Sequence, residues 1–136
     1  MTLVDTNILL DIVTEDSRWA DWSERQLEAA TFDGPLLINR IIYAELSVRF
    51  ERIEDLDAVI LDGGFLMEEI PRAALFLAGK AFARYRALGD TKTGVLPDFF
   101  IGAHAAVNGR RLLTRDVTRY RSYFPNVTLI TPETAS

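Results

Sequence analysis

Short apolar runs alternate with longer amphipathic segments along the 136-residue chain. The apolar runs predict β-strands at residues 3–5, 34–39, 65–70, 110–114 and 127–131. The segments between them carry apolar residues at helical spacing and predict helices at residues 7–13, 15–30, 40–50, 53–62, 71–88 and 97–108, with a short helix within 115–124. This alternation predicts an α/β fold with a mainly parallel sheet, formed by one domain over residues 1–136.

Capping and helix-breaking residues define several of the predicted helix ends. Asp16 or Ser17 is the expected N-cap of the helix at 15–30, and Asn39 is the expected N-cap of the helix at 40–50. Pro97 is expected at the first position of its helix. Helices are expected to stop at Gly63-Gly64, Gly89 and Gly109, with a loop at "GDTKTG", residues 89–94.

Composition excludes several classes of protein. Hydrophobic residues make up 49% of the chain, which is enough for one packed core. There is no cysteine, so a disulfide framework, a thiolate metal site and a cysteine nucleophile are excluded. No apolar run approaches the roughly 20 residues of a membrane span, and no signal peptide is recognised. A cytoplasmic protein without membrane contact is therefore expected.

Charge is distributed unevenly along the chain. The formal net charge of −5 argues against a general nucleic-acid binder. Residues 1–70 carry 16 acids and 5 bases, whereas residues 71–136 carry 4 acids and 10 bases. The chain thus offers an acidic first half and a basic second half.

Three acids are predicted at the edge of the sheet where ligands bind in open α/β folds, which is the carboxyl end of the strands. Asp5 ends the first predicted strand, and Asp116 follows the strand at 110–114. Asp98 lies in the first turn of the helix that follows the "GDTKTG" loop. A buried charge of this kind costs several kcal/mol unless a partner or a metal ion compensates for it.

A fourth acid, Glu45, is predicted on the apolar face of its helix. Ile41, Ile42 and Val48 lie within about 60° of Glu45 on a helical wheel with 100° per residue. Each of the four acids has a structural alternative. Asp5 and Asp116 could cap helices, Asp98 could complement a helix dipole, and Glu45 could pair with an arginine.

The bases near these acids argue for a metal site. Most of them stand in polar stretches, namely Arg40, Arg49, Lys92 and Arg115. Four carboxylates without matched cations predict a site for a divalent ion, and Mg²⁺ and Mn²⁺ are hard cations that take oxygen ligands.

Four motifs in order resemble those of the PIN-domain ribonucleases. They are "VDTNILLD", "YAEL", "LPDFFIGAHA" and "LLTRD". The short chain and its D-T-N start resemble the toxins of VapC-type toxin–antitoxin pairs. The resemblance implies a three-layer α/β/α sandwich and Mg²⁺- or Mn²⁺-dependent endonucleolytic cleavage of RNA. It also implies a small antitoxin protein as partner and a homodimer. Residues 51 to 90 carry no motif.

The resemblance assigns the family's catalytic acidic quartet to Asp5, Glu45, Asp98 and Asp116. Asp5, Asp98 and Asp116 are expected to bind the metal, and Glu45 is expected to hold or deprotonate a water. Thr114 and Asn7 match polar residues that orient carboxylates or waters in the family. Arg115, or another arginine of the basic half, is expected to hold substrate phosphates.

Other chemistry and other functions compete with this interpretation. His104 stands among small residues and is expected to be packed or at the surface, and Trp19 and Trp22 are expected as core or interface anchors. No serine stands in a nucleophile elbow, and no glycine-rich loop is suited to phosphate. The alternatives are a non-catalytic interaction scaffold of the same fold, a phospho-aspartyl protein, and a housekeeping or DNA-directed nuclease.

Overall fold

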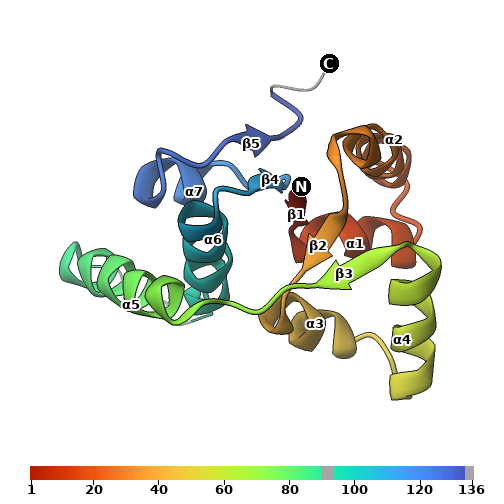
Figure 1. Ribbon diagram of the computed structural model, residues 1–136, viewed down its shortest axis with the longest axis horizontal. Coiled ribbons are helices and arrows are strands. Elements are labelled where there is room, and N and C mark those ends of the chain that lie inside the picture. The colour runs from red at the N-terminus through yellow and green to blue at the C-terminus, as the bar shows by residue number, and fades with distance from the viewer. Residues whose placement is uncertain (90–93, 134–136) are drawn as a thin grey trace.

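The structure is a computed structural model that describes residues 1–89 and 94–133 (Figure 1). Its strands are β1 (Thr2–Val4), β2 (Leu36–Ile38), β3 (Phe65–Met67), β4 (Arg111–Leu113) and β5 (Leu129–Ile130). Its helices are α1 (Thr6–Val13), α2 (Ala20–Ala30), α3 (Arg40–Ser47), α4 (Ile53–Asp62), α5 (Arg72–Ala87), α6 (Leu96–Asn108) and α7 (Thr118–Tyr123), with a 3-10 turn η1 (Thr31–Asp33). Strands and helices alternate as predicted, and residues 90–93 of the predicted loop lie outside the described residues.

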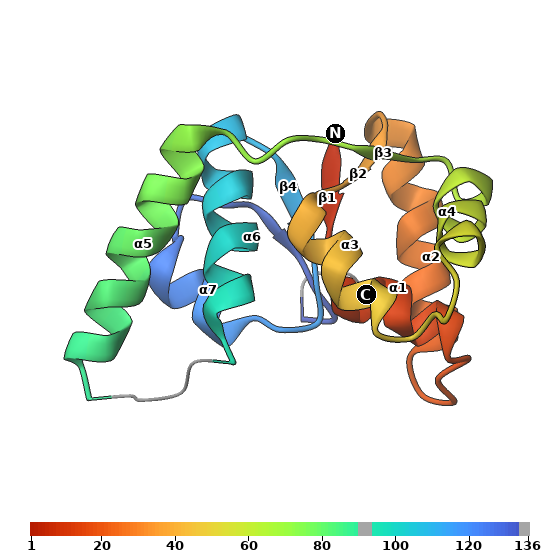
Figure 2. The same ribbon diagram turned by 90° about the horizontal axis from the view of Figure 1, so that it is seen from below.

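The five strands form one sheet in the order β3-β2-β1-β4-β5. Every neighbouring pair is parallel, which confirms the predicted fold class. Val4 of β1 lies in register with Leu113 of β4, so the residues that follow these two strands emerge side by side. Figure 2 shows α1 leaving the sheet on the side at which α6 begins. The first acidic strand end and the start of α6 therefore share one edge.

Helices flank the sheet, with α5, α6 and α7 toward the β4–β5 end and α2 and α4 toward β3 (Figure 1). Aromatic rings join α5, α6 and α7, and the ring centroid of Phe99 lies 5.2 Å from Tyr123 and 5.4 Å from Tyr85. Gly102 of α6 allows a close approach, because a Cβ built there would lie 2.4 Å from the ring of Phe124. A residue without a side chain thus sets the spacing between α6 and the end of α7.

The predicted helix at 15–30 is wrong over its first five residues, because α2 begins at Ala20. The Asp16 carboxylate accepts hydrogen bonds from the backbone N–H of Arg18 at 2.9 Å and of Trp19 at 2.8 Å. Glu15 has a φ of 52°. Short acidic side chains that bond to nearby backbone compete with the helix, and here they produce a turn. Asp16 therefore shapes the turn before α2 instead of capping a longer helix.

The predicted helix at 40–50 is also shorter in the structure. Its N-cap is confirmed, because the Asn39 side chain accepts a hydrogen bond from the Ile42 N–H at 2.9 Å. The helix ends at Ser47, and Val48 is 82% exposed, so Val48 does not belong to the apolar face around Glu45.

The late helix starts one residue earlier than predicted. α6 begins at Leu96, which places Pro97 at its second position instead of its first. Such one-residue shifts are ordinary at helix ends. Among the helices within residues 1–89 and 94–133, none has the length and apolarity that a membrane span requires.

Candidate active site

Asp5 is buried at the edge of the sheet, where it links two neighbouring strands. Its side chain is the N-cap of α1, and Oδ1 accepts a hydrogen bond from the Thr6 N–H at 2.7 Å. Oδ2 accepts from the hydroxyl of Thr114, which follows β4, at 2.8 Å. Oδ2 also accepts from the Tyr120 hydroxyl of α7 at 2.9 Å. Capping and a role at the site are therefore compatible for this residue.

The Asp5 carboxylate is poorly compensated as an anion. Burial raises its pKa from 3.8 to about 7; the Thr114 hydrogen bond opposes the shift and the charge of Asp98 adds to it. Ion pairs within the described residues include Asp11, Asp98 and Asp116 but not Asp5. Burial and the Asp5 charge raise the pKa of Tyr120 well above 10, so Tyr120 stays a neutral donor. Asp5 is held by hydrogen bonds alone.

Glu45 meets Asp5 through a shared threonine. Glu45 is half-buried on α3, and its Oε1 accepts a hydrogen bond from the Thr6 hydroxyl at 2.6 Å. The backbone N–H of the same threonine bonds to Asp5. Thr6, which was not among the predicted site residues, thus links Asp5, which follows β1, to Glu45 of α3. Among the described residues Glu45 forms no ion pair, so the alternative of an arginine partner is not observed.

Asp98 and Asp116 share one cation, Arg119 of α7. Nη1 of Arg119 lies 2.5 Å from Oδ2 of Asp98 and 3.8 Å from Oδ2 of Asp116. The expectation that the acids lack matched cations is therefore wrong for these two. Arg119 was missed, although its position three residues after Asp116 is a sequence signal for an ion pair on a helix.

Charge interactions link the four predicted acids to one another. Burial is the largest influence on Asp98 and raises its pKa. Arg119 opposes the shift, whereas the charges of Asp116 and Glu45 add to it. The charge of Asp98 in turn raises the pKa of Asp5. Asp5, Glu45, Asp98 and Asp116 come from four separate segments, and Thr6 and Arg119 link them in two pairs near the carboxyl edge of the sheet.

Thr114 and Asn7 lie where polar residues can orient these carboxylates. The Thr114 hydroxyl donates to Asp5 and accepts from the Asp116 N–H at 3.0 Å. Nδ2 of Asn7 lies 3.3 Å from the Thr114 hydroxyl and 3.4 Å from Oδ2 of Asp5. Oδ1 of Asn7 accepts from the backbone N–H of Arg115 at 3.2 Å. The two residues fix the turn between β4 and α7 against Asp5.

Arg115 points away from the cluster, toward a buried acid of α1. Its Nε and Nη2 each lie 2.8 Å from a carboxylate oxygen of Asp11, and its guanidinium lies 5.0 Å from the ring centroid of Trp19. Ser23 donates a further bond to Asp11 at 2.7 Å. The predicted contact with substrate phosphates would require Arg115 to leave this pair. Trp19 itself contacts Trp22 edge-to-face at 5.9 Å.

His104 of α6 belongs to a polar network that is separate from the acidic cluster. It is fully buried, with Nδ1 2.9 Å from Nδ2 of Asn39 and Nε2 2.8 Å from Oε1 of Glu68. Burial lowers the pKa of His104. Glu68 also pairs with Arg110, whose hydrogen bonds lower the pKa of Glu68 to about 2. His104 therefore serves packing and not the acidic cluster.

The donor chemistry of the cluster fits a hard divalent cation, because all four groups are carboxylates and one is buried without a cationic partner. The side chains as folded are not gathered around one point. Within the described part of the chain, no three His, Asp or Glu side chains form a group that could hold a metal ion. Instead of a metal ion, the guanidinium of Arg119 contacts two of the four carboxylates, those of Asp98 and Asp116.

One known protein family matches the chain in sequence. The sequence profile of the family described as "PIN domain" matches residues 2–123. No curated protein matches the chain in sequence.

Solved structures with the same fold include several toxin–antitoxin complexes. VapBC2 from Rickettsia felis, bound to a promoter DNA fragment, is similar with a TM-score of 0.70 and 19% identity over 96% of this chain and 97% of that chain. A toxin–antitoxin complex from Klebsiella pneumoniae has a TM-score of 0.69 and 23% identity over 97% and 98%. DNA-bound VapBC from Salmonella typhimurium has a TM-score of 0.69 and 16% identity over 96% of each chain. The TM-scores show a common fold, and at these identities the likeness shows the fold alone.

Proposed function

Because this chain belongs to the PIN-domain family, we propose that it is a Mg²⁺- or Mn²⁺-dependent endoribonuclease and the toxin of a toxin–antitoxin pair. The observation that supports this most is that hydrogen bonds through Thr6 and ion pairs through Arg119 hold Asp5, Glu45, Asp98 and Asp116 near one sheet edge. The cost of gathering four coupled carboxylates there is explained if the edge exists to hold a cation.

The proposed roles follow from the surroundings of each acid. Asp5, Asp98 and Asp116 would hold the ion, which when bound neutralises phosphate charge and lowers the pKa of a water molecule. Glu45, fixed by the Thr6 hydroxyl, would orient that water or accept its proton. Tyr120 donates to Oδ2 of Asp5 and so restrains the direction in which that carboxylate presents its lone pairs.

Basic residues of α5 and α7 are proposed to hold the RNA backbone beside the acids. Arg84 and Arg86 are exposed near the end of α5. Arg84 lies 5.6 Å from the ring centroid of Tyr123, and Arg86 lies 5.8 Å from that of Phe82. Aromatic faces and cations together suit single-stranded nucleic acid, because bases stack on rings and phosphates bind cations. Single-stranded or loop RNA is therefore the proposed substrate.

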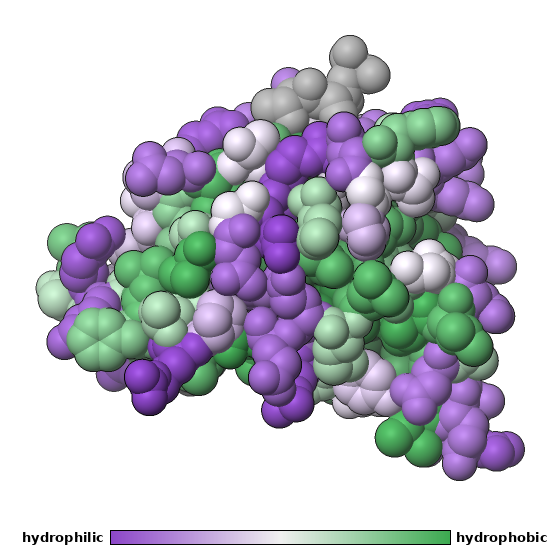
Figure 3. Space-filling model, viewed as in Figure 1, coloured by the Kyte–Doolittle hydropathy of each residue, from purple (hydrophilic) through white to green (hydrophobic). Residues whose placement is uncertain are grey.

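An apolar pocket supports the proposal of a protein partner. It has a volume of about 310 Å³ and is lined mainly by apolar residues of α1, α2 and α4 and of the neighbouring strands, among them Leu9, Ile12, Leu27, Val59 and Phe65. Beside it, Leu66 and Met67 of β3 are 55% and 47% exposed. Figure 3 shows apolar residues gathered over this side of the molecule. An apolar segment of the antitoxin would cover this surface, and a basic side chain of the same partner would reach the acids.

The nuclease proposal is tested by incubating the purified protein with structured RNAs in Mg²⁺, in Mn²⁺ and in chelator. Cleavage of single-stranded or loop segments is expected only with metal. D98A should abolish cleavage while keeping the folded circular-dichroism spectrum. The matched control is D62A, at the end of α4, which should cleave normally. Metal-independent cleavage, or full activity of D98A, would refute the proposed site.

The partner proposal is tested separately by co-expression with the small reading frame next to the gene. A co-purifying complex that suppresses cleavage is expected, and light scattering should show two copies of this chain. A protein that stays monomeric and ignores that partner would argue for a nuclease outside a toxin–antitoxin pair.

A further inference from the structure

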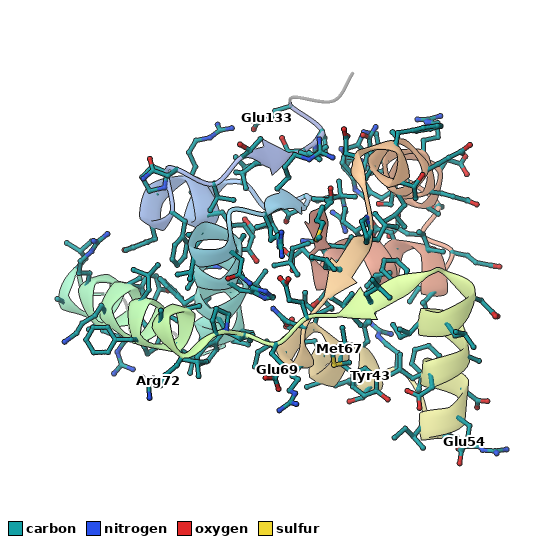
Figure 4. All side chains as sticks on the ribbon, in the orientation of Figure 1. Tyr43, Glu54, Met67, Glu69, Arg72 and Glu133 are labelled. Carbon is teal, nitrogen blue, oxygen red and sulfur yellow. The ribbon has the colours of Figure 1, made fainter. Side chains whose placement is uncertain are left out.

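Arg119 is held more firmly than an ordinary surface arginine. Its side chain and that of Asp98 are only 22% and 24% exposed, and its guanidinium lies 5.8 Å from the ring centroid of Tyr85. Arg121, on the same short helix, pairs with Glu133 at 3.3 Å, and those side chains are 57% and 63% exposed. Figure 4 shows Glu133 near the C-terminal end of the described chain. One arginine of α7 is directed into the acidic cluster and the other into solvent.

Arg119 also takes the place that a metal ion would need. It contacts Asp98 and Asp116, two of the three carboxylates that the proposed function assigns to the ion. A guanidinium and a divalent cation repel each other and compete for the same oxygen lone pairs. The absence of a metal-ready group of three acids among the described residues is consistent with this occupancy.

We propose that Arg119 is an internal counter-ion of the acidic site, which binds Asp98 and Asp116 when no metal is present and has to be displaced before a divalent cation binds. This inference rests on the proposed function. It gives Arg119 control over metal affinity through competition, and it explains how four coupled carboxylates remain folded without metal. Displacement leaves the guanidinium on α7 at the border of the site, where it remains available to an anionic group.

Competition predicts the size of the effect. The apparent dissociation constant of a ligand equals its intrinsic value divided by the fraction of molecules in the competent state. If Arg119 occupies the carboxylates in about 90% of molecules, removing it should tighten metal binding by about tenfold.

The experiment measures binding of Mn²⁺ alone to the purified 136-residue chain by isothermal titration calorimetry. The variants are R119Q and the matched control R121Q, which removes the same charge from the same helix. R119Q should bind Mn²⁺ about tenfold more tightly than wild type, and R121Q should stay within about twofold, since a distant exposed charge is screened. In chelator, R119Q should melt at a lower temperature than R121Q.

A second measurement uses the wild-type protein and needs no substitution. The Arg119 Nε–H resonance should shift when Mg²⁺ is added, because the guanidinium leaves its carboxylates, whereas the Arg121 resonance should not. An unchanged Arg119 resonance at saturating metal would overturn the inference. Equal or weaker Mn²⁺ binding by R119Q would overturn the inference alone. Absence of Mn²⁺ binding by every variant would overturn it together with the metal dependence of the proposed function.

Discussion

Replacing Asp5 by asparagine should stabilise the metal-free protein, although Asp5 is buried and fully hydrogen-bonded. The pKa of Asp5 is raised from 3.8 to about 7, chiefly by burial. Three pKa units correspond to about 4 kcal/mol of unfavourable free energy for the charged form. The amide of D5N can still accept from the Thr6 N–H, but its NH₂ group would face the hydroxyls of Thr114 and Tyr120. Lost or rearranged hydrogen bonds there would cost about 1 kcal/mol each, which leaves a net gain of about 2 kcal/mol.

The pH dependence of this gain has a definite sign. Between pH 3.8 and about 7 the folded protein keeps a proton on Asp5 that the unfolded chain has released. Wild-type stability therefore falls as the pH rises across this window, and D5N lacks this loss. The difference between the two proteins should change by about 4 kcal/mol across this window. D5N should be the less stable protein by about 2 kcal/mol at acidic pH and the more stable by about 2 kcal/mol above about pH 7.

Asp11 provides a matched control on the same helix. It is also buried, at 3% exposure, but Arg115 pairs with both of its oxygens and Ser23 donates to it. D11N should therefore destabilise the protein, by about 2 kcal/mol, because it leaves a half-buried guanidinium without its partner. Asparagine at Asp5, which caps α1, and asparagine at Asp11, within α1, are thus expected to change the free energy of unfolding in opposite directions above about pH 7.

The assay is thermal melting in chelator from pH 4 to pH 8, followed by circular dichroism. D5N should melt about 5 to 10 °C above wild type at pH 8, and D11N should melt below it at every pH. If D5N melts below wild type at pH 8, or if the gap does not change with pH, the description of Asp5 as an uncompensated buried carboxylate is incorrect.

The other predictions concern the remaining charged groups. D98N should weaken the rise in melting temperature that millimolar Mn²⁺ is expected to give the wild type; an unchanged metal response would count against Asp98 as a ligand. E68Q should cost about 2 kcal/mol at pH 7, measured by urea unfolding, because the Arg110 bond lowers the pKa of Glu68 to about 2. This loss should shrink as the pH falls from 4.5 toward 2, and a constant loss would refute it. Because burial lowers the pKa of His104 below 6.5, wild-type stability should also decline as the pH falls through 6.5, and H104N should show a smaller decline.

Much of the acidic cluster was predictable because parallel strands bring their carboxyl ends to one edge. Asp5 and Thr114 follow β1 and β4, which pair in parallel. The fold class alone predicts that such strand ends lie at the ligand-binding edge of the sheet. Glu45 was predictable from the helical wheel, although Val48, one of its supports, lies beyond the helix end. The alternation of strands and helices and the helical periodicity around Glu45 were therefore enough to predict which acids lie near the site.

The compensation of their charge was not predictable in the same way. The sequence predicts Asp5 and Asp98 alike to lack matched cations, but the structure gives Asp98 a cationic partner and Asp5 none among the described residues. That difference depends on the direction of one long side chain, Arg119, which hydropathy does not encode. Tyr120 reaches Asp5 only because α7 packs against α6. The prediction of a helix over residues 15–19 failed for a local reason, because the Asp16 side chain bonds to backbone N–H groups at the turn before α2.

The close contact between Gly102 and Phe124 predicts one place where inactivating mutations should occur. A Cβ at Gly102 would collide with the Phe124 ring, so even alanine would push the end of α7 away from α6. α7 carries both Arg119 and Tyr120 and delivers them to the acids. If the protein inhibits growth as proposed, a selection for cells that survive its expression should recover changes at Gly102, a position with no functional atom, as readily as changes among the carboxylates themselves.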